Sequence, residues 1–330
     1  MSTEMNDEEL IAQVLSLANR NRSVILARHV ASHLCHSADN PVYAARRLLD
    51  RLVKKGLLVR KKSSADLDAY VVTPLGSSLA ESFGMDVPHN IRWGINKRGV
   101  KWAPPPTYRH DIRGLDFVLS VEQIYRKSPA MLAHCLRLTC DPAVLELQTA
   151  TEHEISQVTS KAMAIDPFPG EAKKHDALVW FGGVTYGVEV EGAPKMGEPL
   201  RKLAEAIART SQSNGLSMIM PTERYGEIIV KPELIVVVLP HLPPVRQRVV
   251  ELMRFRIARA VIRYLQDQLR GWEPPDDFTH VFRDNPNELP RGFARFLIVR
   301  ERGVGTFDFG STELCELRYN SNPEHWFKSA

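Results

Sequence analysis

The adjacent glycines at 182–183 are the strongest local constraint on the fold of this chain. Apolar runs flank them at residues 176–181 and 185–191, and a Gly-Gly step between two such runs is typical of a tight β-hairpin. Elsewhere, segments with helical spacing of apolar residues alternate with short apolar runs. The expected strands are residues 135–138, 176–181, 185–191, 216–220, 234–240, 293–300 and 314–319, and the expected helices are 111–127, 151–157, 198–209 and 245–269. This alternation predicts an α/β or α+β fold with a mixed sheet.

Residues 1–84 predict a separate module in the order helix, helix, helix, hairpin, helix. The expected helices are 7–18, 24–34 capped by Ser23, 41–55 and 74–83, and the expected hairpin strands are 57–61 and 69–73. Asn40 is expected to cap the third helix, with Pro41 as its first residue and Gly56 at its end. Three helices followed by a hairpin are the plan of a winged helix-turn-helix module.

The positive charge of this module is concentrated in one stretch. From Arg46 to Lys62 there are eight basic residues and one acid, a balance of +7 over seventeen positions, whereas the rest of residues 1–84 has three basic and eight acidic residues. The whole chain carries only +4, so the distribution of charge is more informative than its total. The basic stretch coincides with the third helix and the hairpin, which suits contact with DNA phosphates.

The third helix is therefore the expected reader of a DNA major groove. Residues in its first half would meet base edges, and later lysines would meet phosphates. The candidate DNA-binding residues are Tyr43, Arg46, Arg47, Arg51, Lys54, Lys61 and Lys62. A solvated basic face, or a winged helix that contacts protein, is the alternative interpretation.

Composition and length bound the remaining possibilities. The 330 residues predict three parts: a DNA-binding module at 1–84, a proline-rich connector at 85–108, and an α/β domain with a C-terminal extension at 109–330. The start is polar and acidic, and the longest apolar run, 234–240, is far shorter than the roughly 20 residues of a membrane span. The four cysteines form no CxxC pair, which favours reduced thiols. We expect a soluble, cytoplasmic protein.

A set of charged residues between positions 151 and 195 points to chemistry. It comprises Thr151-Glu152-His153-Glu154, Lys174-His175-Asp176-Ala177, Gly187-Val188-Glu189-Val190-Glu191 and Lys195. Asp176 begins one strand of the predicted hairpin and Glu189 lies on the other, so their carboxylates can meet. Glu189 and Glu191 alternate on a strand and share a face. Oxygen ligands of this kind suit Mg²⁺, although ordinary surface acids are the alternative.

This order of motifs resembles the PD-(D/E)xK nuclease superfamily. More narrowly, residues 5–210 resemble the replication-relaxation family of plasmid and mobile-element proteins, which is related to the mobilisation relaxases of the MOB-C type. That family has a winged helix in front and a nuclease-type domain behind. The matching positions are His110-Asp111, the helix start Thr151-Glu152-His153-Glu154, Asp176-Ala177, the strand acids Glu189 and Glu191, and Lys195. Residues 211–330 match nothing in the family.

The resemblance implies catalytic roles for Asp176, Glu189, Glu191 and Lys195, with Mg²⁺ or Mn²⁺ as the cofactor. It implies that Asp176 and Glu189 bind the metal. Glu152 is favoured as the third ligand because Glu154 has capping-box spacing to Thr151. Glu191 replaces the usual lysine, which Lys195 would supply from the next loop, and His175 replaces the usual proline.

The leading hypothesis is a metal-dependent nickase of relaxase type that acts in plasmid or mobile-element replication or mobilisation. Its expected partner is double-stranded DNA, and a second copy of the chain and other mobile-element proteins are further candidates. One alternative is a non-catalytic DNA-binding regulator or accessory replication protein with a degenerate nuclease fold. Another is a restriction-type or transposase-type endonuclease that cuts both strands.

Overall fold

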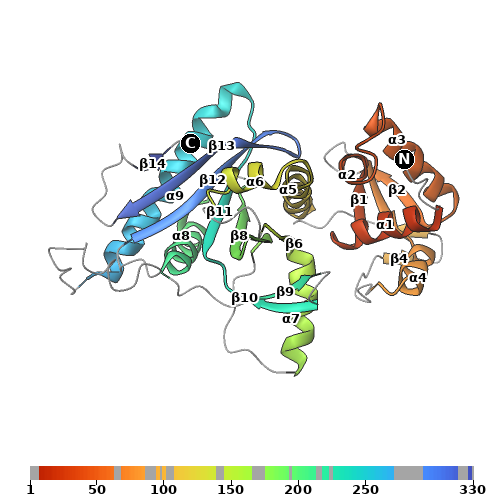
Figure 1. The fold of residues 1–330 in the computed structure, drawn as a ribbon, viewed down its shortest axis with the longest axis horizontal. Coiled ribbons are helices and arrows are strands. Elements are labelled where there is room, and N and C mark those ends of the chain that lie inside the picture. The colour runs from red at the N-terminus through yellow and green to blue at the C-terminus, as the bar shows by residue number, and fades with distance from the viewer. Residues whose placement is uncertain are drawn as a thin grey trace. The chain divides into compact units, whose positions relative to one another are not determined.

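A computed structural model describes most of the chain as two compact units, Met1–Gln123 and Ile124–Ala330. Each unit is mixed α/β (Figure 1). The described residues are 7–62, 68–85, 94–96, 99–101, 108–138, 145–165, 175–192, 195–212, 218–222, 226–270, 293–318 and 326–328. The division falls inside a helix, α5 (Tyr108–Lys127), and not in the proline-rich connector.

The first unit follows the predicted order with one correction. Its elements are α1 (Asp7–Asn19), β1 (Val24–Leu26), α2 (Ala27–His33), α3 (Pro41–Lys54), β2 (Leu58–Lys62), β3 (Asp68–Val72) and α4 (Pro74–Ser82). The predicted helix at 24–34 is wrong in its first turn, because Val24–Leu26 pairs with β3 as a buried strand. Ser23 has a positive φ of 62° and accepts a hydrogen bond from the Val72 amide, so it does not cap a helix.

The third helix begins as the sequence predicts. The Asn40 side chain accepts a hydrogen bond from the Tyr43 amide at 3.1 Å, and Pro41 is the first helical residue. Gly56 follows the helix with a φ of 75°, a conformation that glycine adopts without a steric penalty. These local signals fix both ends of α3.

The strand order β1-β3-β2 gives the first unit a sheet with two covered faces. On one face, Ile25, Leu58 and Tyr70 pack into a core with α1, α2 and α3. On the other, residues of β1 and β3 pack against Tyr108 and Ile112 of α5. Because α5 covers the second face, its first half belongs to this unit.

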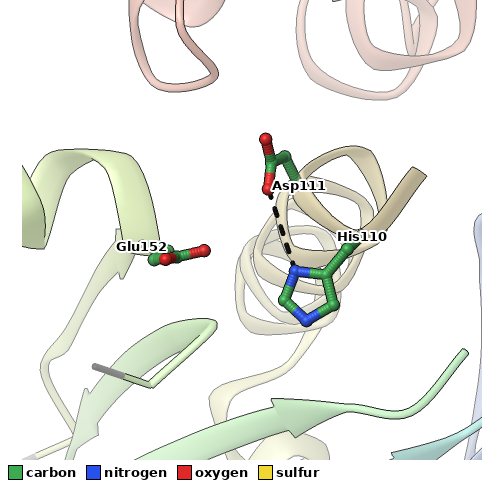
Figure 2. A group of neighbouring side chains, drawn as sticks. All are labelled: His110, Asp111 and Glu152. Carbon is green, nitrogen blue, oxygen red and sulfur yellow. Dashed lines mark ion pairs between the residues drawn. The ribbon is translucent and has the colours of Figure 1, made fainter. Parts of the chain in front are cut away.

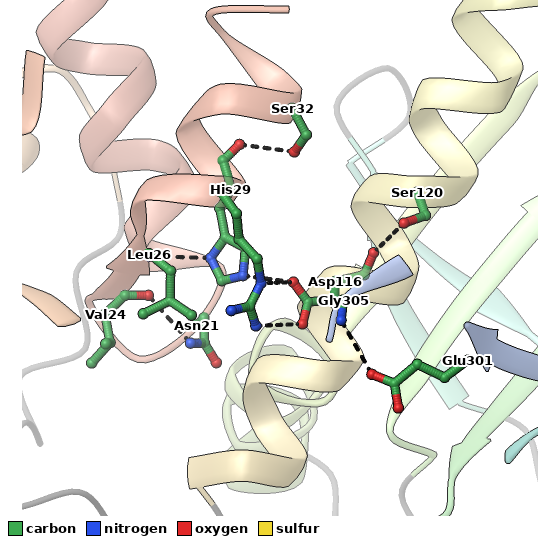
Figure 3. Close-up of polar contacts among 10 residues, drawn as sticks. Asn21, Val24, Leu26, His29, Ser32, Asp116, Ser120, Glu301 and Gly305 are labelled. Atoms are coloured by element: carbon green, nitrogen blue, oxygen red, sulfur yellow. Dashed lines mark hydrogen bonds and ion pairs between the residues drawn. The ribbon is translucent and has the colours of Figure 1, made fainter. Parts of the chain in front are cut away.

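A buried polar network also ties α5 to α2 (Figure 3). Arg28 donates two hydrogen bonds to the Asp116 carboxylate, at 2.8 and 2.7 Å, and His29 Nε2 lies 2.9 Å from Asp116 Oδ1. His29 Nδ1 accepts from the Leu26 amide, so the proton of the neutral ring lies on Nε2 and faces the carboxylate. Burial opposes ionisation of Asp116, but hydrogen bonds from Arg28 and His29 lower its pKa to about 2. Burial also lowers the pKa of His29.

Part of the predicted connector has structure of its own. Strands β4 (Gly94–Asn96) and β5 (Gly99–Lys101) pair as an antiparallel hairpin within residues 85–108. The three prolines at 104–106 lie outside the described residues.

The second unit is built on a seven-stranded sheet of order β14-β13-β12-β11-β8-β7-β6. Its strands are β6 (Leu147–Thr151), β7 (Ala177–Phe181), β8 (Val184–Val190), β11 (Leu234–Leu239), β12 (Phe293–Gly303), β13 (Thr306–Arg318) and β14 (Phe327–Lys328). Strands β6, β7 and β8 form an antiparallel meander, and β11 pairs in parallel with both β8 and β12. The predicted hairpin at residues 176–191 is confirmed, as is the mixed sheet.

Helices connect and cover this sheet. They are α6 (Pro129–Cys135), α7 (Glu152–Ile165), α8 (Gly197–Ser211), the 3₁₀ turn η2 (Pro244–Arg246) and α9 (Gln247–Gln268), and a small hairpin pairs β9 (Met218–Thr222) with β10 (Gly226–Val230). Apolar residues of α8 and α9 pack in one core with Ile235, Val237 and Leu239 of β11, so both helices cover the same face (Figure 1). In the described part of the chain, no helix is both long and apolar enough to cross a bilayer.

One prediction in this unit is wrong, and one strand was not predicted. The run 135–138 is not a strand, because Ser128 caps a helix that begins at Pro129 and ends at Cys135. The sequence also gave no signal for β6, which pairs with β7 from Leu147 to Thr151. Its polar, short-side-chain composition lacks the alternation that marks a half-buried strand.

Replacing Asp116 with asparagine is expected to destabilise the first unit by about 3 kcal/mol, because Arg28 loses its buried counter-ion. The low pKa of Asp116 contributes about 2 kcal/mol of stability that is complete above about pH 4 and lost as the pH falls through about 2. The destabilisation caused by Asp116→Asn should therefore shrink as the pH falls from about 4 to about 2. Hydrogen exchange of α2 and β1 amides measures it.

Asp7→Asn provides the control for this change. Asp7 also pairs with two cations, Arg51 at 3.1 Å and Lys55 at 3.5 Å, but its side chain is 56% exposed. An exposed pair of this kind contributes less than about 1 kcal/mol. Equal effects of the two substitutions on exchange would contradict the role given to the buried network.

Candidate functional site

The candidate catalytic residues gather at the carboxyl end of β8. Asp176 directly precedes β7, and its carboxylate accepts a hydrogen bond from the Val190 amide at 2.5 Å. This contact places the Asp176 side chain on β8 between Glu189 and Glu191. Glu189 and Glu191 are each only 2% exposed. The structure therefore brings together three of the acids that the sequence singled out.

Lys195 joins this group from the loop after β8. Its Nζ lies 2.7 Å from Glu191 Oε1. Burial raises the pKa of Glu191; Lys195 lowers it in part, and the neighbouring carboxylates of Glu189 and Asp176 raise it further. Burial lowers the pKa of Lys195, but the carboxylates of Glu191, Glu189 and Asp176 outweigh it and leave that pKa raised. The four groups thus form one electrostatically coupled cluster.

Glu189 has a partner that sequence reasoning missed. His175 Nδ1 lies 2.8 Å from Glu189 Oε1, and both side chains are buried. The imidazole lies over Gly187, where a Cβ atom would come within 2.8 Å of His175 Nε2. A glycine inside a strand often marks such a close approach, so Gly187 was the available signal.

A small cavity opens beside Glu191 on the α8 and α9 side of the sheet. Its volume is about 10 Å³, the space of roughly one water molecule. Its polar lining residues are Glu191, Lys195 and Arg256 of α9, and Leu200, Leu203, Met253 and Ile257 complete the wall. The cavity thus places Arg256 of α9 next to the acidic cluster.

Glu152 lies at the same end of the sheet. Its amide donates to the Asp176 carbonyl at 2.9 Å, so the two residues are neighbours across β6 and β7. Glu154 serves the helix start, since its Oε2 accepts from the Thr151 amide at 2.7 Å and its own amide donates to Thr151 Oγ1 at 3.3 Å. The capping box predicted from the spacing is confirmed, so Glu154 serves the helix start and Glu152 is not part of the cap.

The side chains at this end of the sheet offer the type of ligand atom that a hard divalent cation prefers. Asp176, Glu189 and Glu191 provide three carboxyl groups beside one ammonium, and all their donor atoms are oxygens. In the described part of the chain, no three of these acids and Glu152 place ligand atoms within 4.8 Å of one another. The carboxylates are instead held by His175, Lys195 and the Val190 amide.

Two further residues of the motif that the sequence resembles lie in the first turn of α5, in the first unit. His110 Nδ1 lies 3.8 Å from Asp111 Oδ1 (Figure 2), and Asp111 Oδ2 lies 3.6 Å from Arg22. Asp111 therefore joins α5 to the loop after α1. Glu152, also drawn in Figure 2, is the first residue of α7 in the second unit.

The candidate DNA-contacting face of α3 is exposed as predicted. Tyr43 is 60% exposed, and Arg46, Arg47 and Lys54 are exposed as well. Arg47 lies over the Tyr43 ring at 5.9 Å, whereas Arg51 pairs with Asp7. Lys61 lies on β2 and is half-buried, and the side chain of Lys62 lies outside the described residues.

Tyrosine is another residue type that can act as a nucleophile. Tyr186 is 1% exposed, with its hydroxyl 3.4 Å from the Leu136 carbonyl. Tyr264 lines a separate hollow with Arg209, Gln212 and Gln268, and burial raises its pKa. Tyr225 lies outside the described residues. The acidic cluster is therefore the stronger candidate for chemistry.

No protein-family model matches the chain, and comparisons with curated proteins and with solved structures found no match either.

The packing of His175 over Gly187 generates a prediction. Gly187→Ala is expected to displace the imidazole from Glu189 and to destabilise the second unit by about 1–3 kcal/mol, because the added methyl has no space. In a His175→Ala background the same change should cost less than about 0.5 kcal/mol. A double-mutant cycle measured by chemical denaturation gives the coupling.

Gly310→Ala is the control for this cycle, because the nearest atom to its added Cβ is Asp308 Oδ1 at 3.7 Å, an ordinary contact. The change in unfolding free energy caused by Gly310→Ala should be the same with and without the His175 side chain. If Gly187→Ala lowers the unfolding free energy equally in the native and His175→Ala backgrounds, a neighbour other than the imidazole causes the loss of stability.

Proposed function

We propose that this protein is a DNA-binding, metal-dependent endonuclease that nicks one strand, of the relaxase type that acts in plasmid or mobile-element replication or mobilisation. The observation that carries the proposal is the coupled cluster of Asp176, Glu189, Glu191 and Lys195 at the carboxyl end of β8. Ligands and reacting groups commonly lie at this end of parallel strands.

The order of elements around the cluster supports a nuclease-type domain. Helix α5 precedes the meander β6, β7 and β8, and α8 then leads to β11, which is parallel to β8. Asp176 directly precedes the second strand of this meander and Glu189 lies on the third, as in the motif that the sequence resembles. The first unit, with three helices and the β2–β3 hairpin, supports a winged helix with α3 as its reading helix.

The residues have separate roles in this proposal. Asp176 and Glu189, with Glu152 beside them, would hold Mg²⁺ or Mn²⁺. Such an ion, when bound, activates water and offsets the charge that develops on the phosphate. Lys195 holds the buried carboxylate of Glu191, and it lines the cavity together with Arg256. Charged donors fixed in this way need no rearrangement as charge develops.

One observation favours a second candidate, a non-catalytic DNA-binding regulator or accessory replication protein. Glu189 and Glu191 already have partners, His175 at 2.8 Å and Lys195 at 2.7 Å. Contacts of this kind stabilise a fold whose acids have no further role. The two candidates differ in a single observable, the cleavage of DNA in the presence of a divalent ion.

Supercoiled DNA that carries the native locus is expected to become open-circular with the protein and Mg²⁺ or Mn²⁺. Asp176→Ala should abolish that product, by a factor of about 10² or more, because a ligand of the ion is lost. Agarose gels follow the conversion. Asp267→Ala, an exposed acid that pairs with Arg270, serves as the control and should retain activity.

The products distinguish the alternatives. Linear DNA as the first product would favour an enzyme that cuts both strands. Binding without cleavage under either ion would favour the non-catalytic candidate. Cleavage that persists unchanged in Asp176→Ala would place the reaction elsewhere.

Replacing Arg46 and Arg47 together with alanine is expected to weaken binding to duplex DNA and to flatten its dependence on salt. Each lost phosphate contact lowers the slope of log K against log salt by about 0.9. Fluorescence anisotropy measures both quantities. Arg20→Ala, which removes an arginine already paired with Glu122 at 2.7 Å, is the comparison, and equal affinity of all three proteins would reject α3 as the reader.

A further inference from the structure

The outer face of α9 carries a second concentration of positive charge. Arg248, Arg256, Arg259 and Arg263 are exposed and recur at intervals of eight, three and four residues. At about 100° per residue these positions share one stripe of the helix. The opposite side, including Val250, is buried against α8 and the sheet. We define this set of four side chains as the α9 arginine stripe.

The arginines of the stripe differ from their neighbours in having no acidic partner among the described residues. Both acids of the helix are engaged elsewhere: Glu251 contacts Arg254 and Arg300, and Asp267 contacts Arg270. On α8, Arg201 and Arg209 are likewise paired, with Glu198 and Glu205. An amphipathic helix needs only a polar outer face, so four exposed arginines that neither acid of the helix pairs with favour an anionic partner.

The stripe leads to the acidic cluster. Arg256 lines the cavity that Glu191 and Lys195 form. From Arg248 to Arg263 the helix rises about 22 Å, which corresponds to roughly six phosphates of one strand at about 3.4 Å each. The spacing and the position of Arg256 therefore suit a strand that runs along α9 and passes the cluster.

From these observations we infer that the α9 arginine stripe binds the phosphate backbone of a DNA strand and guides it to the Glu191–Lys195 cavity. This inference rests on the proposed function for its choice of nucleic acid. It assigns to the second unit a binding surface independent of α3. Because guanidinium groups meet phosphates through paired N–H donors, the contact would be independent of sequence.

The test measures binding by the full chain in EDTA, so that cleavage does not contribute. The probes are a fluorescein-labelled 30-nucleotide single strand and the matching duplex, both of unrelated sequence. The test variant is Arg256→Gln with Arg259→Gln and Arg263→Gln. The matched control is Arg201→Gln with Arg209→Gln and Arg270→Gln, which removes the same charge from exposed arginines that are paired with acids.

The test variant should lower the slope of log K against log salt by about 2 on the single strand and by up to about 3 on the duplex. Its affinity should fall tenfold or more, and the control should change affinity less than about twofold. An Arg→Lys version of the test variant should keep most of the slope, because lysine also contacts phosphate. Circular dichroism would verify that each variant is folded, and glutamine keeps helix propensity.

Equal slopes for the test and control variants would overturn the inference. So would loss of binding to phosphatidylserine vesicles with unchanged DNA binding, which would assign the stripe to a lipid surface. Failure of the proposed function would give a different result. The protein would not nick DNA with Mg²⁺ or Mn²⁺, but the test and control variants would still differ in the slope of log K against log salt. Loss of duplex binding in Arg46→Ala with Arg47→Ala reports on α3 alone.

Discussion

Strand β8 is the constraint on which the second unit depends. It pairs antiparallel with β7 on one side and parallel with β11 on the other, and Glu191 continues the second ladder by donating to the Val238 carbonyl. A parallel neighbour requires a crossover, and α8 provides it. The carboxyl end of β8 is therefore enclosed by the start of β7, by the loop with Lys195 and by α8 and α9. The acidic cluster lies at this end of the sheet.

The two units bury carboxylates in opposite ways. Asp116 receives two hydrogen bonds from Arg28 and one from His29, and its pKa falls to about 2. Glu191 is as deeply buried but has one ammonium and two like-charged neighbours, so its pKa is raised. The first arrangement stabilises the ionised acid and joins α2 to α5. The second leaves negative charge only partly offset, which is a feature of sites that bind cations or carry out acid-base chemistry.

The arginines also fall into two groups, those paired with acids and those that face solvent. Arg28, Arg254 and Arg300 contact acids and tie elements together, and Arg254 also lies 4.1 Å from the centre of the Phe327 ring. Arg46 and Arg47 on α3, and the α9 arginine stripe, face solvent without such contacts in the described part of the chain. Paired arginines explain the packing of each unit. The exposed ones supply the charge through which each unit could hold a polyanion.

Local sequence signals determined the mixed fold class, the Gly182-Gly183 hairpin, both ends of α3 and the capping box at Thr151 and Glu154, because each depends on residues that are close in the chain. The same spacing placed Asp176 opposite Glu189. Tertiary structure alone decided that Val24–Leu26 is a strand, since its partner β3 lies more than forty residues away. It also decided that His175 engages Glu189 and that Arg256 of α9 lines the same cavity as Glu191. Those contacts arise from strand pairing and helix packing across long separations, which no local pattern encodes.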